Sequence, residues 1–466
     1  MTDNHRLETD SLGEVRVPSH ALWGAQTQRS LINFSISDDL VPFELIYALA
    51  KIKRAAAVVN NRLGVLDKEK RNLIIKAASE IEEGLHNQHF PLRVWQTGSG
   101  THTNMNINEV ISNLASQTNG ELLGSHKPLH PNDDVNRSQS TNDTFPSAIH
   151  IAAVEGITRT LLPEVQLLVD EFDEKSKAWQ EIIKVGRTHL QDAVPITLGQ
   201  EVSAWRDQVA IAYKRIEKSL NELYPLPLGG TAVGTGLNSP VNFDQEAAAE
   251  ISKLTGLPFR SATNKFAVMA SHDGLVNTMS QLKLLAVALL KIVNDLRLLS
   301  CGPRAGIAEL KLPENEPGSS IMPGKINPTQ CEAMAMVCIQ VMGLDIAVAM
   351  AGSGGHLQMN AYKPLIGFNL LHSIELLHDA CKNCRTAMVE GLQPNHERIQ
   401  KDLEQSLMLV TALTPEIGYE KASKIAQLAH SKEISLREAA LELDYISDID
   451  FDRIVDPSSM IKPNNE

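Results

Sequence analysis

Residues 275–299 read LVNTMSQLKLLAVALLKIVNDLRLL and carry a helical pattern over their whole length. Large apolar residues recur at intervals of three and four, which places them on one face of a helix. They are Leu275, Met279, Leu282, Leu285, Leu289, Ile292, Leu296 and Leu299. Leu284, Val287, Ala288 and Leu290 widen this face until most of the helix is apolar. Such a helix has to be enclosed by other helices, so the pattern predicts an oligomer whose core is shared between subunits.

Helical spacing dominates the rest of the chain as well. A second stripe is formed by Val202, Trp205, Val209, Tyr213, Ile216, Leu220 and Leu223. Further helices are predicted at 43–63, 68–85, 105–118, 146–161, 163–180, 332–351, 360–388 and 396–407. Alternating strand patterns are rare, with short strands expected only within residues 13–33. The predicted fold class is therefore mainly α.

Two turn-rich stretches divide the chain. Residues 124–142 contain glycine, proline, asparagine and aspartate, and Gln393-Pro394-Asn395 interrupts a helical pattern near the C-terminal end. We therefore expect an N-terminal domain over 1–138, a central long-helix bundle over 139–394 and a small helical C-terminal domain over 395–466.

Composition excludes several classes of protein. The 466 residues include 43 Lys+Arg and 56 Asp+Glu, a formal net charge of −13. This balance argues against general nucleic-acid binding, which needs a basic face. Because 43% of the residues are apolar and 21% are charged, the chain is expected to fold rather than remain disordered.

Residues 1–20 carry charges throughout and lack the apolar run of a secretory signal. Five cysteines do not make a disulfide framework, so a reducing, cytoplasmic location is expected. Residues 333–351 are the most apolar stretch, but Gln340, Gly343 and Asp345 interrupt it. We interpret it as a buried helix rather than a membrane span.

Two polar segments precede predicted helices. Residues 97–104, TGSGTHTN, and 138–143, SQSTND, combine hydroxyl and amide side chains with helix N-termini, where backbone N–H groups favour an anion. Each segment could instead be an ordinary N-cap. A shared site is more plausible for two such segments than for one.

Two further segments carry groups that can move protons or hold negative charge. Residues 186–193, GRTHLQDA, contain His189, which can relay a proton but could equally be structural. Residues 312–328, LPENEPGSSIMPGKINP, form a Pro/Gly-rich loop that offers Ser319, Ser320, Lys325 and Asn327. Long loops of this kind are usually lids or binding loops, although an ordinary surface loop remains open.

Cofactor signatures are weak. Cys381 and Cys384 form a CxxC within a helical pattern and lack a second ligand pair, so no metal site is predicted. No Walker or dinucleotide-binding glycine motif is found. Hydroxyls, amides, one histidine and one lysine on separate loops suit a small polyanion, from which a base removes a carbon-bound proton. Donors aimed at the resulting aci-carboxylate should contribute most of the rate.

Several motifs together resemble the fumarase/aspartase superfamily, and class II fumarases most closely. They are Trp23-Gly-Ala-Gln-Thr-Gln-Arg29, Asn104-Met-Asn-Ile-Asn-Glu109, His130-Pro-Asn-Asp-Asp-Val-Asn136, Gly186-Arg-Thr-His-Leu-Gln-Asp-Ala193 and Gly318-Ser-Ser-Ile-Met-Pro-Gly-Lys-Ile-Asn-Pro-Thr-Gln-Cys-Glu332. The resemblance implies reversible hydration of fumarate to (S)-malate in the tricarboxylic acid cycle, without metal or organic cofactor. It also implies a homotetramer with active sites shared by three chains, and no nucleic-acid or membrane partner.

The resemblance also assigns roles to individual residues. Ser319 matches the base for the C3 proton, and His189 matches the residue that handles the hydroxyl through a water, with Glu332 polarising it. Substrate-binding positions match Ser99, Gly100, Thr101, Ser140, Thr141, Asn142, Thr188, Ser320, Lys325, Ile326 and Asn327. A second dicarboxylate site matches His130, Pro131, Asn132 and Asp133.

Two alternatives stay open. An aspartate ammonia-lyase, or another lyase of the superfamily, is favoured by Thr141, where class II fumarases usually have serine, and His102 also departs from the usual glutamine. His189, Gly324 and His130 favour a fumarase instead. A superfamily member turned non-enzymatic scaffold would be expected to lack Ser319, His189 or Lys325, all of which are present.

Overall fold

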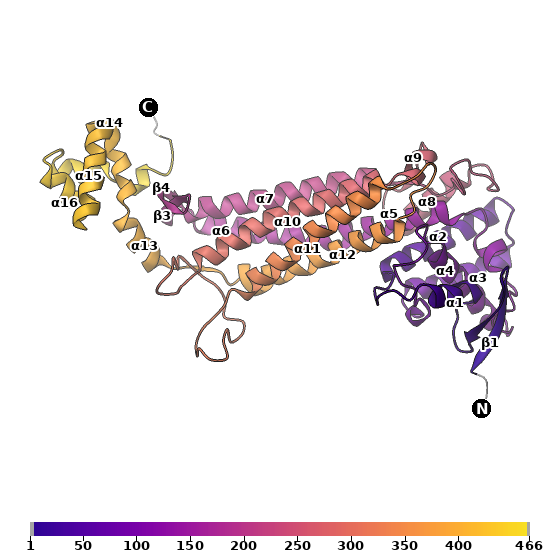
Figure 1. Ribbon diagram of the computed structural model, residues 1–466. Coiled ribbons are helices and arrows are strands. Elements are labelled where there is room, and N and C mark those ends of the chain that lie inside the picture. Colours follow the sequence, from indigo (N-terminus) through magenta and orange to yellow (C-terminus); the bar gives the residue numbers. More distant parts are fainter. Residues whose placement is uncertain (1–3, 464–466) are drawn as a thin grey trace. The chain divides into compact units, whose positions relative to one another are not determined.

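The computed structural model describes residues 4–463, and 62% of these residues are helical, which confirms the mainly α fold class (Figure 1). The α-helices are α1 Ala25–Asn33, α2 Phe43–Arg62, α3 Lys68–Glu82, α4 Thr101–Thr118, α5 Thr141–Gly156, α6 Leu162–Ala178, α7 Leu198–Ser219, α8 Phe243–Thr255, α9 Lys265–Ala270, α10 Asp273–Leu299, α11 Thr329–Ser353, α12 Lys363–Cys384, α13 His396–Gln405, α14 Thr414–Ile417, α15 Tyr419–Lys432, α16 Leu436–Glu442 and α17 Asp448–Ile454. Short 3₁₀ or π-helical turns are η1 Asn87–His89, η2 Pro131–Val135, η3 Ile157–Leu161, η4 Leu220–Glu222, η5 Arg385–Val389, η6 Leu407–Leu413 and η7 Pro457–Ser459.

Strands form only two-stranded sheets within residues 4–463. The strands are β1 His5–Asp10, β2 Gly13–Pro18, β3 Ile183–Thr188, β4 Gln191–Thr197, β5 Pro225–Leu226, β6 Arg260–Ser261, β7 Leu310–Lys311 and β8 Gln393–Pro394. The pairs β1–β2, β3–β4 and β7–β8 are antiparallel, and β5–β6 is parallel. The strands expected within 13–33 are thus limited to β2, and its partner β1 lies upstream of that range.

Contacts divide the chain into two compact units. Unit 1 comprises Met1–Pro163, Ala212–Ala286 and Val337–His378, and unit 2 comprises Glu164–Ile211, Val287–Met336 and Asp379–Glu466. These boundaries fall inside α6, α7, α10, α11 and α12 rather than in turn-rich stretches. The predicted division at residues 138 and 394 stays a prediction.

The pattern over 275–299 forms α10, and all eight residues of its stripe are buried, with Leu299 the most exposed at 5%. The residues that widen this apolar face are less buried than the stripe itself. Val287, for example, is 48% exposed in the single chain. Helix α11 likewise presents four large apolar side chains to solvent. They are Met336, Ile339, Ile346 and Met350.

Helix α11 is also the one helix within residues 4–463 that is long and apolar enough to cross a membrane. The same test is passed by core helices of other proteins, and 33% of the most apolar window is buried here. Asp345 lies in this helix, 5% exposed, and accepts hydrogen bonds from Lys283 at 2.5 Å and Ser280 at 3.0 Å on α10. A charge-paired carboxylate in mid-helix favours a protein neighbour over lipid.

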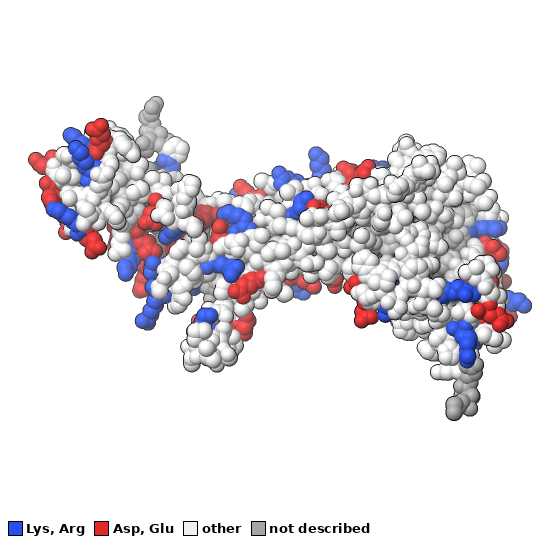
Figure 2. Space-filling view, in the orientation of Figure 1, with Lys and Arg blue, Asp and Glu red and all other residues white. Residues whose placement is uncertain are grey.

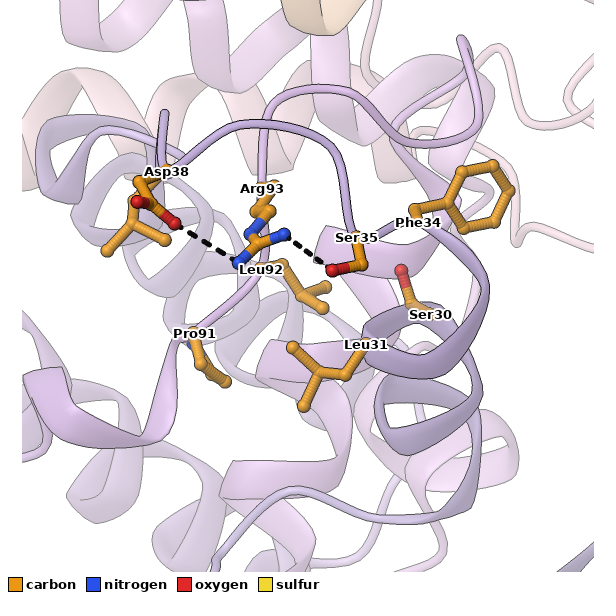
Figure 3. A pocket seen from close by; sticks show the side chains of 9 residues that line it. Ser30, Leu31, Phe34, Ser35, Asp38, Pro91, Leu92 and Arg93 are labelled. Carbon is orange, nitrogen blue, oxygen red and sulfur yellow. Dashed lines mark hydrogen bonds and ion pairs between the residues drawn. The ribbon is translucent and has the colours of Figure 1, made fainter.

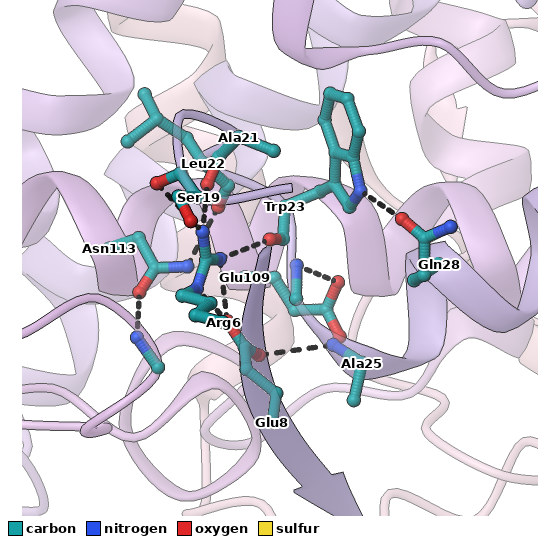
Figure 4. Close-up of polar contacts among 12 residues, drawn as sticks. Arg6, Glu8, Ser19, Ala21, Leu22, Trp23, Ala25, Gln28, Glu109 and Asn113 are labelled. Carbon is teal, nitrogen blue, oxygen red and sulfur yellow. Dashed lines mark hydrogen bonds and ion pairs between the residues drawn. The ribbon is translucent and has the colours of Figure 1, made fainter. Parts of the chain in front are cut away.

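A buried carboxylate fixes the start of α1 in unit 1. Glu109, on α4, accepts hydrogen bonds from the backbone N–H groups of Gly24, Gln26 and Thr27 and from the Thr27 hydroxyl at 2.6 Å. Beside it, Glu8 accepts a hydrogen bond from the Ala25 N–H group (Figure 4). Because the first N–H groups of a helix have no partner within the helix, these carboxylates complete the hydrogen bonding of α1.

We expect Glu109→Gln to lower the free energy of unfolding by about 2 kcal/mol, because its NH₂ group would face N–H donors. Burial raises the pKa of Glu109 to about 7, well above its ordinary value of 4.5. Protonation of Glu109 therefore stabilises the folded state. This stabilisation is lost as the pH rises from about 4.5 to 7. In urea unfolding at several pH values, the free energy of unfolding of the variant should change less with pH than that of the wild type. The exposed Glu121→Gln is the matched control, and an unchanged midpoint for Glu109→Gln would contradict the role.

A buried ion cluster and an apolar cluster hold the β3–β4 hairpin in unit 2. Lys184, 1% exposed, lies 3.0 Å from both Glu201 and Glu309, and Arg187 donates to Glu309 at 2.8 Å. Val185 packs into the core formed by the C-terminal helices, which includes Leu413 and Ile425. The hairpin backbone is therefore fixed from both of its faces.

Candidate active site

The first predicted segment forms a tight turn at the start of α4 in unit 1. Gly100 is the residue before the helix, with φ of +79°, and a Cβ there would lie 2.4 Å from Phe145. A Cβ on Gly98 would lie 1.5 Å from the carbonyl oxygen of Ala361. Glycine is therefore required at both positions. The turn brings the hydroxyls of Ser99 and Thr101 within 2.7 Å of each other.

The second segment begins α5, and here the sequence prediction is wrong in detail. The helix starts at Thr141 rather than near Pro146, which lies inside it. Ser140 and Asp143 form a capping box, and these reciprocal hydrogen bonds stabilise a helix start ahead of the proline. Thr141 and Asn142 thus lie in the first turn, and the Asn142 amide donates to the carbonyl of Ala232 at 2.8 Å.

The two segments meet within unit 1. The Asn104 amide, on α4, donates to the Thr141 hydroxyl at 3.0 Å. It also donates to the side-chain oxygen of Asn136 at 3.1 Å. Buried Lys53, on α2, donates to the same Asn136 oxygen and to the Gln139 side-chain oxygen.

Sequence reasoning did not assign roles to Lys53, Asn104 or Asn136. The signal that could have found Lys53 is a lysine in the middle of the apolar pattern over 43–63. Asn104 and Asn136 stand at the ends of motifs that carried the family resemblance, but nothing in the sequence shows that they touch.

The predicted second dicarboxylate site lies in the turn η2. The His130 imidazole accepts hydrogen bonds at Nδ1 from the backbone N–H groups of Asn132 and Asp133, so its proton is on Nε2. His130 lies edge-on to His126, with ring centres 4.9 Å apart. Both rings line a cavity of about 210 Å³ that Glu109 also lines.

A different cavity, of about 360 Å³, lies between α1 and the segment before α4 (Figure 3). Its lining includes Arg93, which is already bonded to Asp38 at 3.2 Å and Ser35 at 3.0 Å. None of the predicted site residues lines it.

Unit 2 presents His189 at the tip of the β3–β4 hairpin. Thr188 pairs with Gln191, and the two residues between them, His189 and Leu190, have φ of +55° and +61°. This is a two-residue hairpin turn with both φ values positive. The His189 side chain is exposed there.

Ser319 lies in the predicted loop of unit 2, which has a defined hydrogen-bond pattern. Its Oγ accepts from the backbone N–H groups of Ile321 at 3.3 Å and Met322 at 3.0 Å. The Asn327 amide donates to the Gly318 carbonyl, and the Gly318 N–H donates to the Lys325 carbonyl at 2.9 Å. The loop thus folds back on itself and leaves Ser320, Lys325 and Ile326 exposed.

Glu332 lies in the first turn of α11, 3.7 Å from the Arg297 guanidinium. Within unit 2, no hydrogen bond or ion pair between described residues joins His189, Ser319 and Glu332. Unit 1 therefore holds one group of predicted site residues, and unit 2 holds the others on separate segments. Among residues 4–463, no three His, Cys, Asp or Glu side chains are grouped to hold a metal ion.

Known proteins match the chain over nearly its whole length. The family model described as "Lyase" matches residues 13–343, and "Fumarase C C-terminus" matches 409–462. A fumarate hydratase class II of Prochlorococcus marinus (strain MIT 9313) is 73% identical over 460 residues, which are 99% of each chain. The crystal structure of class II fumarase from Schistosoma mansoni has a TM-score of 0.96 and 44% identity, covering 99% of this chain and 100% of that one.

The chain belongs to the class II fumarate hydratase family. Membership confirms the resemblance inferred from the motifs and makes the chain a lyase. The Pseudomonas putida fumarate hydratase class II is 54% identical over 461 residues, 99% of each chain, so the family match extends well beyond one group of organisms.

Proposed function

We propose that this chain catalyses the reversible hydration of fumarate to (S)-malate as a homotetramer, each active site combining residues of three chains. The observation that carries the proposal is Ser319, whose Oγ receives two backbone N–H groups. A serine hydroxyl is a weak base, and two aligned donors stabilise the alkoxide that makes it a stronger one. Lys325 follows in the same loop and adds positive charge nearby once the loop closes.

In the dehydration direction, the Ser319 alkoxide removes the C3 proton of malate. The charge spreads into the adjacent carboxylate as an aci-carboxylate. A water held by His189, with Glu332 polarising the imidazole, protonates the departing hydroxyl. Donors from two helix N-termini hold the carboxylates: Ser99, Gly100, Thr101, Ser140, Thr141 and Asn142. Thr188, Ser320, Lys325, Ile326 and Asn327 complete the binding positions.

Shared sites are supported by where these groups lie. His189 is exposed at a hairpin tip, and Lys325 is exposed on its loop. Neither is enclosed by its own unit, as a water-excluding site requires. The exposed apolar side chains of α11, such as Met336 and Ile346, supply surface for neighbouring subunits.

The proposal also covers the location, the pathway and the partners of the enzyme. The enzyme would work in the cytoplasm as part of the tricarboxylic acid cycle. Lys and Arg alternate with Asp and Glu on the face seen in Figure 2, without the continuous basic surface that nucleic acid needs. His130, Pro131, Asn132 and Asp133 would hold a second dicarboxylate.

The purified protein should consume fumarate in water, seen as loss of its near-ultraviolet absorbance, with no requirement for ammonia. Light scattering should give the mass of four chains. Loss of fumarate only when ammonia is present would shift the assignment to an aspartate ammonia-lyase. Full activity in a single-chain particle would contradict the shared sites.

A further inference from the structure

Lys53 is a buried lysine that has no role in the proposed hydration of fumarate. It lies on α2, is 0% exposed, and is surrounded by the apolar positions of that helix. Its Nζ donates to the side-chain oxygens of Asn136 at 2.9 Å and Gln139 at 3.0 Å. A buried lysine without a directly bonded carboxylate is costly, which points to a role other than stability.

The contacts around Lys53 continue to the candidate active site. Asn136 Oδ1 also accepts from Asn104 Nδ2 at 3.1 Å, and the same Nδ2 donates to Thr141 Oγ1 at 3.0 Å. Asn104 is 1% exposed and Thr141 is 8% exposed. Lys53, Asn136, Asn104 and Thr141, here called the α2–α5 relay, therefore form one continuous chain of side-chain hydrogen bonds.

The direction of each hydrogen bond in the relay follows from the lysine. An ammonium group can only donate, so Asn136 has to present its oxygen to Lys53. That oxygen can only accept from Asn104, which must therefore present its NH₂ group. The second hydrogen of this NH₂ group goes to a lone pair of Thr141. The Thr141 hydroxyl proton is thereby left free to be donated outward.

Other contacts agree with these orientations. Gln139 turns its NH₂ group to the carbonyls of Val135 and Arg137, leaving its oxygen for Lys53. Burial lowers the pKa of Lys53 to about 7, and the charge of nearby Asp143 opposes this fall. Even the neutral amine keeps two N–H groups, one for each oxygen that it contacts, so the direction of the relay is the same in both states.

The geometry points to Lys53 as a positioning residue that makes Thr141 a hydrogen-bond donor to a substrate carboxylate. This inference rests on the proposed function, because it takes Thr141 as a binding position for a dicarboxylate. Two long hydrogen bonds favour the same orientations, from Asn136 Nδ2 to the Gln139 carbonyl at 3.3 Å and from the Thr144 hydroxyl to Asn104 Oδ1 at 3.4 Å. Without the shorter bond from the lysine, we expect both amides to rotate. The Asn104 oxygen would then accept the Thr141 proton, and the carboxylate would lose its donor.

The test compares Lys53→Met with Lys51→Met in the full-length enzyme. Lys51 lies on the same helix but pairs with Glu155 at 3.1 Å, away from the relay. We expect Lys53→Met to raise KM for fumarate about tenfold, with kcat changed less than about threefold, and Lys51→Met to leave both within about twofold. A KM that rises equally in both variants, or in neither, would overturn the relay.

A double variant separates this role from a general loss of structure. If Lys53 acts through Thr141, Lys53→Met adds little to the KM of Thr141→Val, whereas independent effects multiply. Multiplying effects would overturn the proposal.

Should Lys53→Met fail to fold, Asn104→Asp serves instead. Its carboxylate can only accept hydrogen bonds, so this variant should raise KM similarly, and an unchanged KM would again overturn the proposal. A wild-type enzyme that does not hydrate fumarate would defeat the proposed function itself, a result distinct from an active wild type with an unaffected Lys53→Met.

Discussion

We expect Ser319→Ala to lower kcat for fumarate hydration by about a thousandfold while KM changes only a few-fold. The alanine side chain cannot take or return the C3 proton, and general acid–base groups contribute roughly 10²- to 10⁴-fold to rate. The backbone N–H groups of Ile321 and Met322 would lose their acceptor, but both residues are exposed and can bond to water. Steady-state kinetics in both reaction directions measures the effect.

Ser320→Ala is the control for this substitution, because it removes a hydroxyl from the neighbouring position of the same loop. As a binding group, Ser320 should affect KM more than kcat. Light scattering should give the same particle mass for wild type and both variants. Turnover of Ser319→Ala close to that of wild type would remove Ser319 from the role of base.

The second large effect is expected for His189→Asn, with kcat falling about a hundredfold. Asparagine is chosen because His189 has φ of +55°, a conformation that asparagine tolerates better than most residues. The hairpin turn should therefore persist while the titratable imidazole is lost. Kinetics reports the effect, and circular dichroism checks the fold.

Leu190→Asn is the matched control, since Leu190 is the other residue of the turn, with φ of +61°, and is 70% exposed. Its kcat should stay within about threefold of wild type. If both variants lose activity equally, the shape of the hairpin rather than the imidazole carries the effect. If neither does, another group handles the hydroxyl.

Much of the fold could be predicted from apolar spacing alone. Helix α10 follows the pattern over 275–299, and its eight stripe residues are buried, because a helix returns the same face every three to four residues. Helix starts were less predictable. Pro146 suggested a start near itself, whereas the capping box of Ser140 and Asp143 begins α5 five residues earlier.

The candidate site was predictable as a set of residue types, not as an arrangement. Ser319 and His189 stood out as candidates because they lie in polar segments, and the family resemblance supplied the roles proposed for them. Nothing in the sequence indicated that two N–H groups of the loop bond to the Ser319 oxygen, or that His189 lies at a hairpin tip.

Short sequence patterns were enough to predict the mainly helical class, the family and the polar segments, because these features depend on residues close together in sequence. Contacts between distant residues required the tertiary structure. Lys53 and Asn136 are 83 positions apart, yet they share a hydrogen bond that orients Asn104 and Thr141. Hydrogen-bond direction depends on which groups meet in space, and spacing along a chain does not contain that information.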